Sequence, residues 1–155
     1  MTAAVRIRVA GIVQGVGYRP FVWRLAQELG ILGWVRNDAR GVEIHAEAGD
    51  VAGFVARLKT EAPPLARVDA VTATSAATEA HDAFVIAHTD GNGSAATAIG
   101  PDSAVCGDCL ADMFGPENRR WRYAFTNCTN CGPRYTITRN LPYDRPQTSM
   151  AGFVM

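Results

Sequence analysis

Hydrophobic and polar residues alternate along the first half of the chain with the period of two that is typical of half-buried β-strands. Residues 5–12 show the alternation first. Residues 32–37 and 42–47 show it again on either side of a short turn, so they are expected to pair as a hairpin. Two further alternating stretches lie at about 66–74 and 82–88. The pattern therefore predicts four strands and an additional fifth.

Two segments between these strands have apolar residues at the spacing of an amphipathic helix instead. The first begins near Pro20, because proline costs no hydrogen bond in the first turn of a helix, and it ends at Gly30. The second follows Asp50, whose carboxylate can cap a helix, and it ends before Pro63. The order β-α-β-β-α-β predicts an α+β fold of the ferredoxin-like type, with both helices on one face of an antiparallel sheet.

The composition is that of a globular protein without an obvious polyanionic partner. Apolar residues make up 48% of the 155 residues and charged residues 19%, and the formal net charge is zero. No apolar run approaches the roughly 20 residues that span a bilayer, and the N-terminus lacks the apolar stretch of a signal peptide. We therefore expect a cytoplasmic protein that binds neither membrane nor nucleic acid.

A glycine-rich turn between the first strand and the first helix is the first candidate for chemistry. Gly15 and Gly17 permit backbone conformations in which successive N–H groups point into one concavity, which suits an anion. The helix N-terminus adds a favourable dipole, and Arg19 adds a forked cation that matches phosphate oxygens. Turns of this kind are also common without a ligand. The residues alone thus leave a phosphate site and a purely structural turn both open.

Asn37, at the end of the second predicted strand, is the second candidate. An asparagine in this place is usually a turn residue, because its side chain mimics the backbone. A functional role becomes attractive if the strand that carries Asn37 lies next to the strand that leads into the Gly15 turn. We expect that adjacency from the β-α-β order.

Together, these segments resemble the acylphosphatase family over about residues 4–90. The resemblance is carried by Val13-Gln14-Gly15-Val16-Gly17-Tyr18-Arg19, by Gly33-Trp34-Val35-Arg36-Asn37, and by Gly41-Val42-Glu43 and Gly49. It implies that the turn from Gln14 to Tyr18 and the guanidinium of Arg19 bind the phosphoryl group of an acyl phosphate. It also implies that Asn37 orients the attacking water. Catalysis would then consist of positioning and charge stabilisation, without a nucleophilic side chain.

The three histidines do not suggest a site. His45 falls on the polar face of the third predicted strand and is expected to be exposed. His81 and His88 are too scattered along the chain to look like ligands.

All four cysteines fall in a short region that begins a second structural unit. They form two Cys-x2-Cys pairs, Cys106 with Cys109 and Cys128 with Cys131. Two such knuckles can close a tetrahedron around zinc, and we favour zinc over a redox pair, a disulfide framework or an iron–sulfur cluster. Because four thiolates leave no open coordination position, this site is expected to be structural and not catalytic.

Residues 119–125 lie between the knuckles and mix arginines with aromatic residues. Such a mixture can stack on single-stranded nucleic acid. The alternative, which we favour, is that Trp121, Tyr123 and Phe125 form a strand that packs around the metal with the arginines outside.

With the cysteine pairs included, the chain resembles the N-terminal part of the hydrogenase-maturation carbamoyltransferases of the HypF type. The run from Cys131 to Met150 contributes to this resemblance. The expected organisation is an acylphosphatase-like domain at 1–90, a linker at 91–104 and a zinc-finger segment at 105–155. The family continues with a second pair of knuckles, so we expect a fragment whose tail beyond about residue 132 is poorly ordered for want of its packing partner.

The resemblance implies that the first domain hydrolyses carbamoyl phosphate or another acyl phosphate. The carbamoyl group would later reach a hydrogenase-maturation partner protein through domains that this chain lacks. Two alternatives stay open at this point. One is a free-standing acylphosphatase with a stabilising zinc tail, and the other is a non-catalytic, zinc-bearing interaction module.

Overall fold

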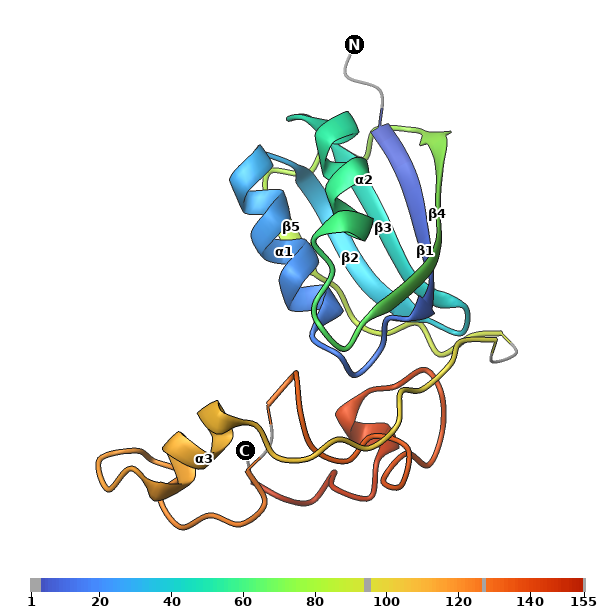
Figure 1. Cartoon of the computed structure of the whole chain (residues 1–155). Coiled ribbons are helices and arrows are strands. Elements are labelled where there is room, and N and C mark those ends of the chain that lie inside the picture. Colours follow the sequence, from blue (N-terminus) through green and yellow to red (C-terminus); the bar gives the residue numbers. More distant parts are fainter. Residues whose placement is uncertain (1–3, 94–95, 127, 155) are drawn as a thin grey trace.

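The computed structural model describes residues 4–93, 96–126 and 128–154. Residues 94 and 95 of the expected linker lie outside this range. The chain forms two parts that differ in kind (Figure 1). A sheet with two helices on one face makes up the first, and a segment dominated by turns makes up the second. The second part lies beyond the end of the sheet at which the connection between β1 and α1 turns.

The sheet has five strands in the order β4-β1-β3-β2-β5. Its strands are β1 (Ala4–Ile12), β2 (Leu32–Asp38), β3 (Gly41–Glu47), β4 (Arg67–Ala76) and β5 (Phe84–Ile86). All neighbours pair antiparallel except β2 and β5, which pair parallel. The predicted α+β class and the β2–β3 hairpin are confirmed.

The expected adjacency of β1 and β2 is wrong, because β3 lies between them. β1 pairs with β3 on one side and β4 on the other, as in the pairs Ile7–Ile44 and Ile7–Ala73. This central position buries Ile7 completely. Local alternation identifies a strand but does not choose its partner, which depends on contacts between distant parts of the chain.

Both helices cover the same face of the sheet and enclose the hydrophobic core with it (Figure 1). α1 (Tyr18–Leu29) starts two residues before Pro20, which stands in its first turn, where no N–H is needed. α2 (Val51–Thr60) starts at the predicted cap, because the carboxylate of Asp50 accepts a hydrogen bond from Gly53 N at 2.9 Å. The largest fully buried side chains include Tyr18, Phe54, Ile7, Ile31, Ile44 and Leu58.

The second part contains the short helices α3 (Gly107–Phe114) and η1 (Arg145–Gln147) among turns. The strand expected at 121–125 is wrong. Backbone N–H groups there bond three residues back, as Trp121 N does to Asn118 O and Tyr123 N to Arg120 O, and Arg122 has a φ of 59°. Trp121 and Phe125 are 49% and 55% exposed, so these rings are not a core around the metal.

The expectation of an unpacked tail beyond residue 132 is also wrong. Arg134 and Thr148 are only 4% and 2% exposed. Tyr143 joins the tail to the first part through hydrogen bonds to Gln14 and Asn37. The first part itself is thus the packing partner of the tail. Within the described residues, no helix combines the length and apolar character needed to cross a membrane.

Candidate phosphate site and metal centre

The turn between β1 and α1 has the backbone shape that an anion-binding loop requires. Gly15 and Gly17 have φ angles of 70° and 76°, in the left-handed region that glycine adopts without strain. A Cβ on Gly15 would also come within 3.0 Å of the Tyr143 ring, and one on Gly17 within 3.0 Å of Thr129. The two glycines therefore shape the loop and also let the second part approach it.

A cavity of about 460 Å³ lies between this loop and the second part. Arg19 reaches it from α1 and Asn37 from the end of β2, so the structure brings the two predicted catalytic residues together even though β1 and β2 are not neighbours. The second part supplies the other wall. Its lining residues include Arg120, Thr129, Arg134, Tyr143, Asp144 and Arg145.

Asn37 is 1% exposed and is held in one orientation by the second part. Its Nδ2 donates to the backbone carbonyl of Tyr143 at 3.0 Å. Only the amide nitrogen can donate to a carbonyl, so this bond fixes which end of the side chain is the oxygen. The buried Oδ1 has no hydrogen-bond partner among the described residues. It is therefore available to accept a hydrogen bond from a water or a substrate.

Arg19 is connected to a carboxylate of the second part through Thr89. Its NH1 donates to Thr89 Oγ1 at 3.4 Å, and Thr89 Oγ1 donates to Asp144 Oδ2 at 2.9 Å. Asp144 Oδ1 lies 3.8 Å from Arg19 NH2. The cavity thus places a carboxylate beside the cation that would bind phosphate.

The side chains of the other residues predicted for substrate binding make contacts within the protein instead. Gln14 Nε2 donates to the carbonyls of Asp38 and Gly41, both at 2.7 Å, and its Oε1 accepts from Tyr143 N at 2.7 Å. Tyr18 is buried and donates to Leu58 O, and this burial raises the pKa of its phenol. Val16 is 2% exposed in the core. Any contribution of these residues to an anion would come from the backbone.

Sequence reasoning missed Thr89, Arg134, Tyr143 and Asp144. The side chain of Arg134 donates to the carbonyls of Gly15 and Cys128, so it connects the glycine-rich turn to the second cysteine pair. Three of these residues lie in the run from Cys131 to Met150 that carried the family resemblance. That signal marked the run as important but did not say what it contacts.

The four cysteines form a second site. Sulfur separations are 3.6 Å for Cys106–Cys128, 3.5 Å for Cys128–Cys131 and 3.5 Å for Cys131–Cys109. A tetrahedron with Zn–S bonds of 2.3 Å has edges of about 3.8 Å, so the donor set fits zinc closely. The N–H of Asn130 donates to Cys128 Sγ at 3.2 Å, which stabilises a thiolate. The first pair lies in the opening turn of α3 and not in a separate tight turn.

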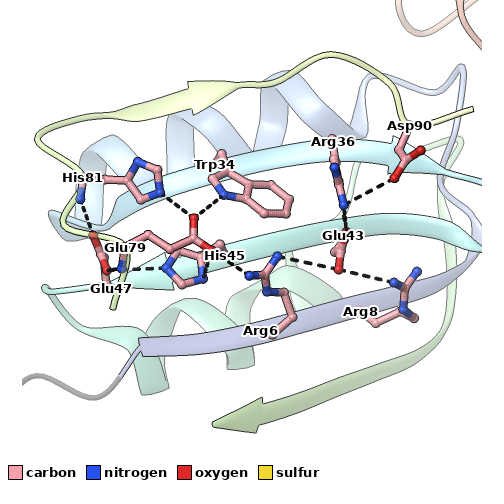
Figure 2. Close-up of polar contacts among 10 residues, drawn as sticks. All are labelled: Arg6, Arg8, Trp34, Arg36, Glu43, His45, Glu47, Glu79, His81 and Asp90. Carbon is pink, nitrogen blue, oxygen red and sulfur yellow. Dashed lines mark hydrogen bonds and ion pairs between the residues drawn. The ribbon is translucent and has the colours of Figure 1, made fainter. Parts of the chain in front are cut away.

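The open face of the sheet carries a polar network that contradicts the expectation for two histidines (Figure 2). His45 was expected to be exposed, but it is fully buried. Trp34 stacks on its ring with centroids 6.1 Å apart, and the ring of His81 lies 5.6 Å away. His81 is therefore close to His45 in space, although the two residues are far apart in the sequence. His88 is exposed.

Comparisons with known proteins agree with this architecture. Residues 5–86 match the acylphosphatase family model, and residues 105–138 match the model of the HypF finger. An acylphosphatase of Thermotoga petrophila is 42% identical over 87 residues, which cover 54% of this chain and 94% of that protein. The chain therefore belongs to the acylphosphatase family.

The particular combination of this domain with a finger is that of the HypF carbamoyltransferases. Carbamoyltransferase HypF2 of Cupriavidus necator is 57% identical over 157 residues, covering 98% of this chain and 19% of that protein. A crystal structure of full-length HypF in a phosphate- and nucleotide-bound form has a TM-score of 0.92 and 38% identity, covering 100% of this chain and 21% of that one. The chain spans about a fifth of the length of these relatives. The matched finger and the fit of the four sulfurs together identify the cysteine site as a zinc site.

Proposed function

We propose that the first part of the chain hydrolyses acyl phosphates and that its physiological substrate is carbamoyl phosphate. The observation that carries the proposal is that Gly15, Gly17, Arg19 and Asn37 line the same cavity. This arrangement provides a cation and a helix N-terminus for a phosphoryl group and a free amide oxygen for a water.

In the proposed reaction, Arg19 and the backbone N–H groups of the loop hold the phosphoryl oxygens and stabilise the charge that develops on them. Asn37 Oδ1 accepts a hydrogen bond from water and aims its oxygen at phosphorus. A new P–O bond forms to that oxygen while the P–O bond to the acyl oxygen breaks. Carbamate leaves as an anion, and the phosphate retains the proton that the water gives up. No nucleophilic side chain is required.

Asp144 supports carbamoyl phosphate over other acyl phosphates. A carboxylate beside Arg19 repels a phosphoryl group, so phosphate binding alone does not explain it. The carbamoyl group carries an NH2 that can donate to this carboxylate, whereas the methyl group of acetyl phosphate cannot. We propose that Asp144 selects the substrate by accepting this hydrogen bond.

The wider role follows from the relatives that are called carbamoyltransferases. We propose that the carbamate formed here serves domains of a longer protein, which pass the carbamoyl group to a protein that matures nickel–iron hydrogenases. We propose a cytoplasmic location as well, because cysteines that hold a metal and form no disulfides are typical of a reducing compartment. The alternatives are a free-standing acylphosphatase and a non-catalytic module.

The test is phosphate release from carbamoyl phosphate and from acetyl phosphate. Arg19→Ala should impair both KM and kcat, whereas Asn37→Ala should lower kcat by about 10²–10³ and leave phosphate affinity nearly unchanged. Asp144→Ala should lower the preference for carbamoyl phosphate by about 10- to 100-fold, the value of a hydrogen bond to a charged group. Asp144 also caps η1, because its Oδ1 accepts a hydrogen bond from Arg145 N at 2.9 Å. Asp144→Asn keeps a neutral acceptor and this cap, so its preference for carbamoyl phosphate should lie between those of the unmodified chain and Asp144→Ala.

The outcomes separate the hypotheses. Equal gains on both substrates in Asp144→Ala would mean that Asp144 only competes with phosphate for Arg19. Broad turnover without preference for carbamoyl phosphate in the unmodified chain would favour a free-standing acylphosphatase. No hydrolysis of either substrate, together with no phosphate binding near Arg19, would leave the non-catalytic module.

A further inference from the structure

A cluster of two imidazoles and two carboxylates lies on the open face of the sheet (Figure 2). His45 and Glu47 occupy alternate positions of β3 and so point to the same face. Glu79 and His81 come from the connection between β4 and β5, which folds over that face. Asn37 pairs with Val42 and Trp34 with His45, so the cluster is also displaced along the strands from the phosphate site.

The side chains of the cluster lie almost close enough together to bind one metal ion. His45 Nε2 lies 3.4 Å from Glu47 Oε2, and His81 Nε2 lies 3.0 Å from Glu79 Oε2. One ligand atom each from His45, Glu47 and His81 can be chosen so that all lie within 4.8 Å of one another. Ligand atoms around a tetrahedral ion with bonds of about 2.0–2.1 Å are separated by about 3.3 Å. Shortening the longest of these separations by up to about 1.5 Å would bring the three atoms to that spacing.

One buried ring nitrogen in the cluster makes no hydrogen bond to a described residue. His45 is 0% exposed, and its Nδ1 has no hydrogen-bond partner among the described residues, although Glu79 Oε1 lies 3.8 Å away. An unpaired buried polar atom is unfavourable. A cation bound at Nδ1, on the side of the ring that faces Glu79, would remove this cost.

The charge of the cluster also favours a cation. Glutamate side chains are ionised at neutral pH, so the cluster contains two carboxylates. Trp34 Nε1 donates to Glu79 Oε2 at 3.1 Å, and His81 Nε2 lies 3.0 Å from the same oxygen. Against these two negative charges, Arg6 contacts Glu79 at 2.8 Å.

Glu47 is oriented as a metal-binding carboxylate would be. Its Oε1 accepts from His81 N at 2.5 Å and its Oε2 from Glu79 N at 3.0 Å. Oε1 keeps a second lone pair, whereas that of Oε2 faces His45 Nε2 at 3.4 Å. Outer hydrogen bonds of this kind hold metal ligands in place.

We propose that His45, Glu47 and His81 form a second metal site, for a divalent ion of the zinc class, with Glu79 as a further ligand or as the acceptor for a ligating imidazole. Imidazole with carboxylate suits zinc and its neighbours, whereas magnesium and calcium prefer all-oxygen sets. The ion would fasten the connection between β4 and β5 to the sheet. It is separate from the four-cysteine zinc site and from the phosphate site.

The experiment is a metal titration of the full chain after its metal has been removed. Zinc should bind in two steps, first at the cysteines and then at the histidine cluster. With cobalt, the second equivalent should add ligand-field bands without thiolate-to-metal charge transfer. His81→Ala, in a side chain that is 27% exposed and therefore tolerant of change, should weaken the second step by at least about 100-fold and leave the first intact.

His88→Ala is the matched control and should bind both ions as the unmodified chain does. Glu47→Gln provides a second test that removes a ligand charge but keeps an amide that can accept one of the backbone N–H groups. Saturation at one ion per chain would overturn the proposal. So would a second step that survives His81→Ala, or one that His81→Ala and His88→Ala weaken equally.

Discussion

The two parts of the molecule are held together by different forces. In the first part, a five-stranded sheet and two helices bury a continuous set of apolar side chains, including Ile7, Phe54 and Leu58 at 0% exposure. In the second part, the largest apolar side chains are on the surface, as Phe114 at 71% and Phe125 at 55% show. Four cysteine sulfurs and polar contacts to the first part replace the missing core. One chain therefore combines a domain stabilised by the burial of apolar side chains with a segment stabilised by metal ligation.

The largest expected effect comes from removing zinc. Structural zinc contributes about 10–16 kcal/mol in small zinc-binding units, far more than the apolar contacts of residues 105–154 can supply. Chelation, or Cys131→Ser, should unfold this segment and leave residues 4–86 folded. Hydrogen exchange resolved by residue would show the division. A single cooperative loss of both parts would contradict it.

The activity of the zinc-free chain sharpens the same comparison. Arg19 and Asn37 belong to the first part, so hydrolysis of acetyl phosphate should persist. Its kcat should fall, because Asn37 loses the Tyr143 carbonyl that orients its amide. The preference for carbamoyl phosphate should be lost, because Asp144 comes from the second part.

A matched pair of truncations tests the role of burial. Leu58→Ala removes a fully buried side chain and should lower the free energy of unfolding of the first part by about 2–5 kcal/mol. Phe125→Ala removes a larger but half-exposed ring from the second part and should change stability by no more than about 0.5 kcal/mol. Urea unfolding of the zinc-loaded chain measures both. A larger loss for Phe125→Ala would mean that an apolar core does stabilise the second part.

Arg134→Ala tests the contact between the two parts. This residue is 4% exposed and donates to the carbonyls of Gly15 and Cys128, which its removal would leave without these donors. Docking of the second part should weaken by about 2–4 kcal/mol, and protease cleavage within residues 133–150 should rise. The exposed Arg139 provides the control, and Arg139→Ala should leave the cleavage rate unchanged. Equal rates in the two variants would mean that other contacts hold the parts together.

The smallest expected effect concerns helix capping. Asp50 caps α2 with its carboxylate, whereas Cys106, the N-cap residue of α3, makes no side-chain hydrogen bond to the helix. Asp50→Ala should cost about 1 kcal/mol, and the cost should be the same with and without zinc. Thermal unfolding at two zinc concentrations measures it. A zinc-dependent cost would show that the parts unfold together.

The sequence was sufficient for the elements of the first part because each has a local signal. The alternation in β3 and the Asp50 cap are read from neighbouring residues. Strand order could not be read in this way, because the pairing of β1 with β3 depends on contacts between residues about 40 apart in the sequence, such as Val5 and Ala46. The zinc ligands were recognised for the same local reason, since Cys-x2-Cys spacing is a short-range signal.

The candidate site was only half predictable. Arg19 and Asn37 were named from motifs, but Asp144 and the role of Tyr143 depend on how the second part lies over the loop. His45 was misjudged because a histidine on a polar strand face is exposed unless another segment covers it. The covering residues Glu79 and His81 lie more than thirty positions away, and no local sequence pattern indicates that they cover His45.

The central place of β1 in the sheet has a consequence for the order of events during synthesis. Its two partners are β3 and β4, so β1 cannot complete its pairing before residues up to Ala76 have left the ribosome. Domains fold largely as units while the chain is extended at about 5–20 residues per second. The cysteine pairs emerge later, with Cys131 more than fifty residues behind. A newly made chain therefore passes through a period of a few seconds in which the turn that carries Gly15 and Gly17 is assembled while Tyr143 and Asp144, which line the other wall of the cavity, are still absent.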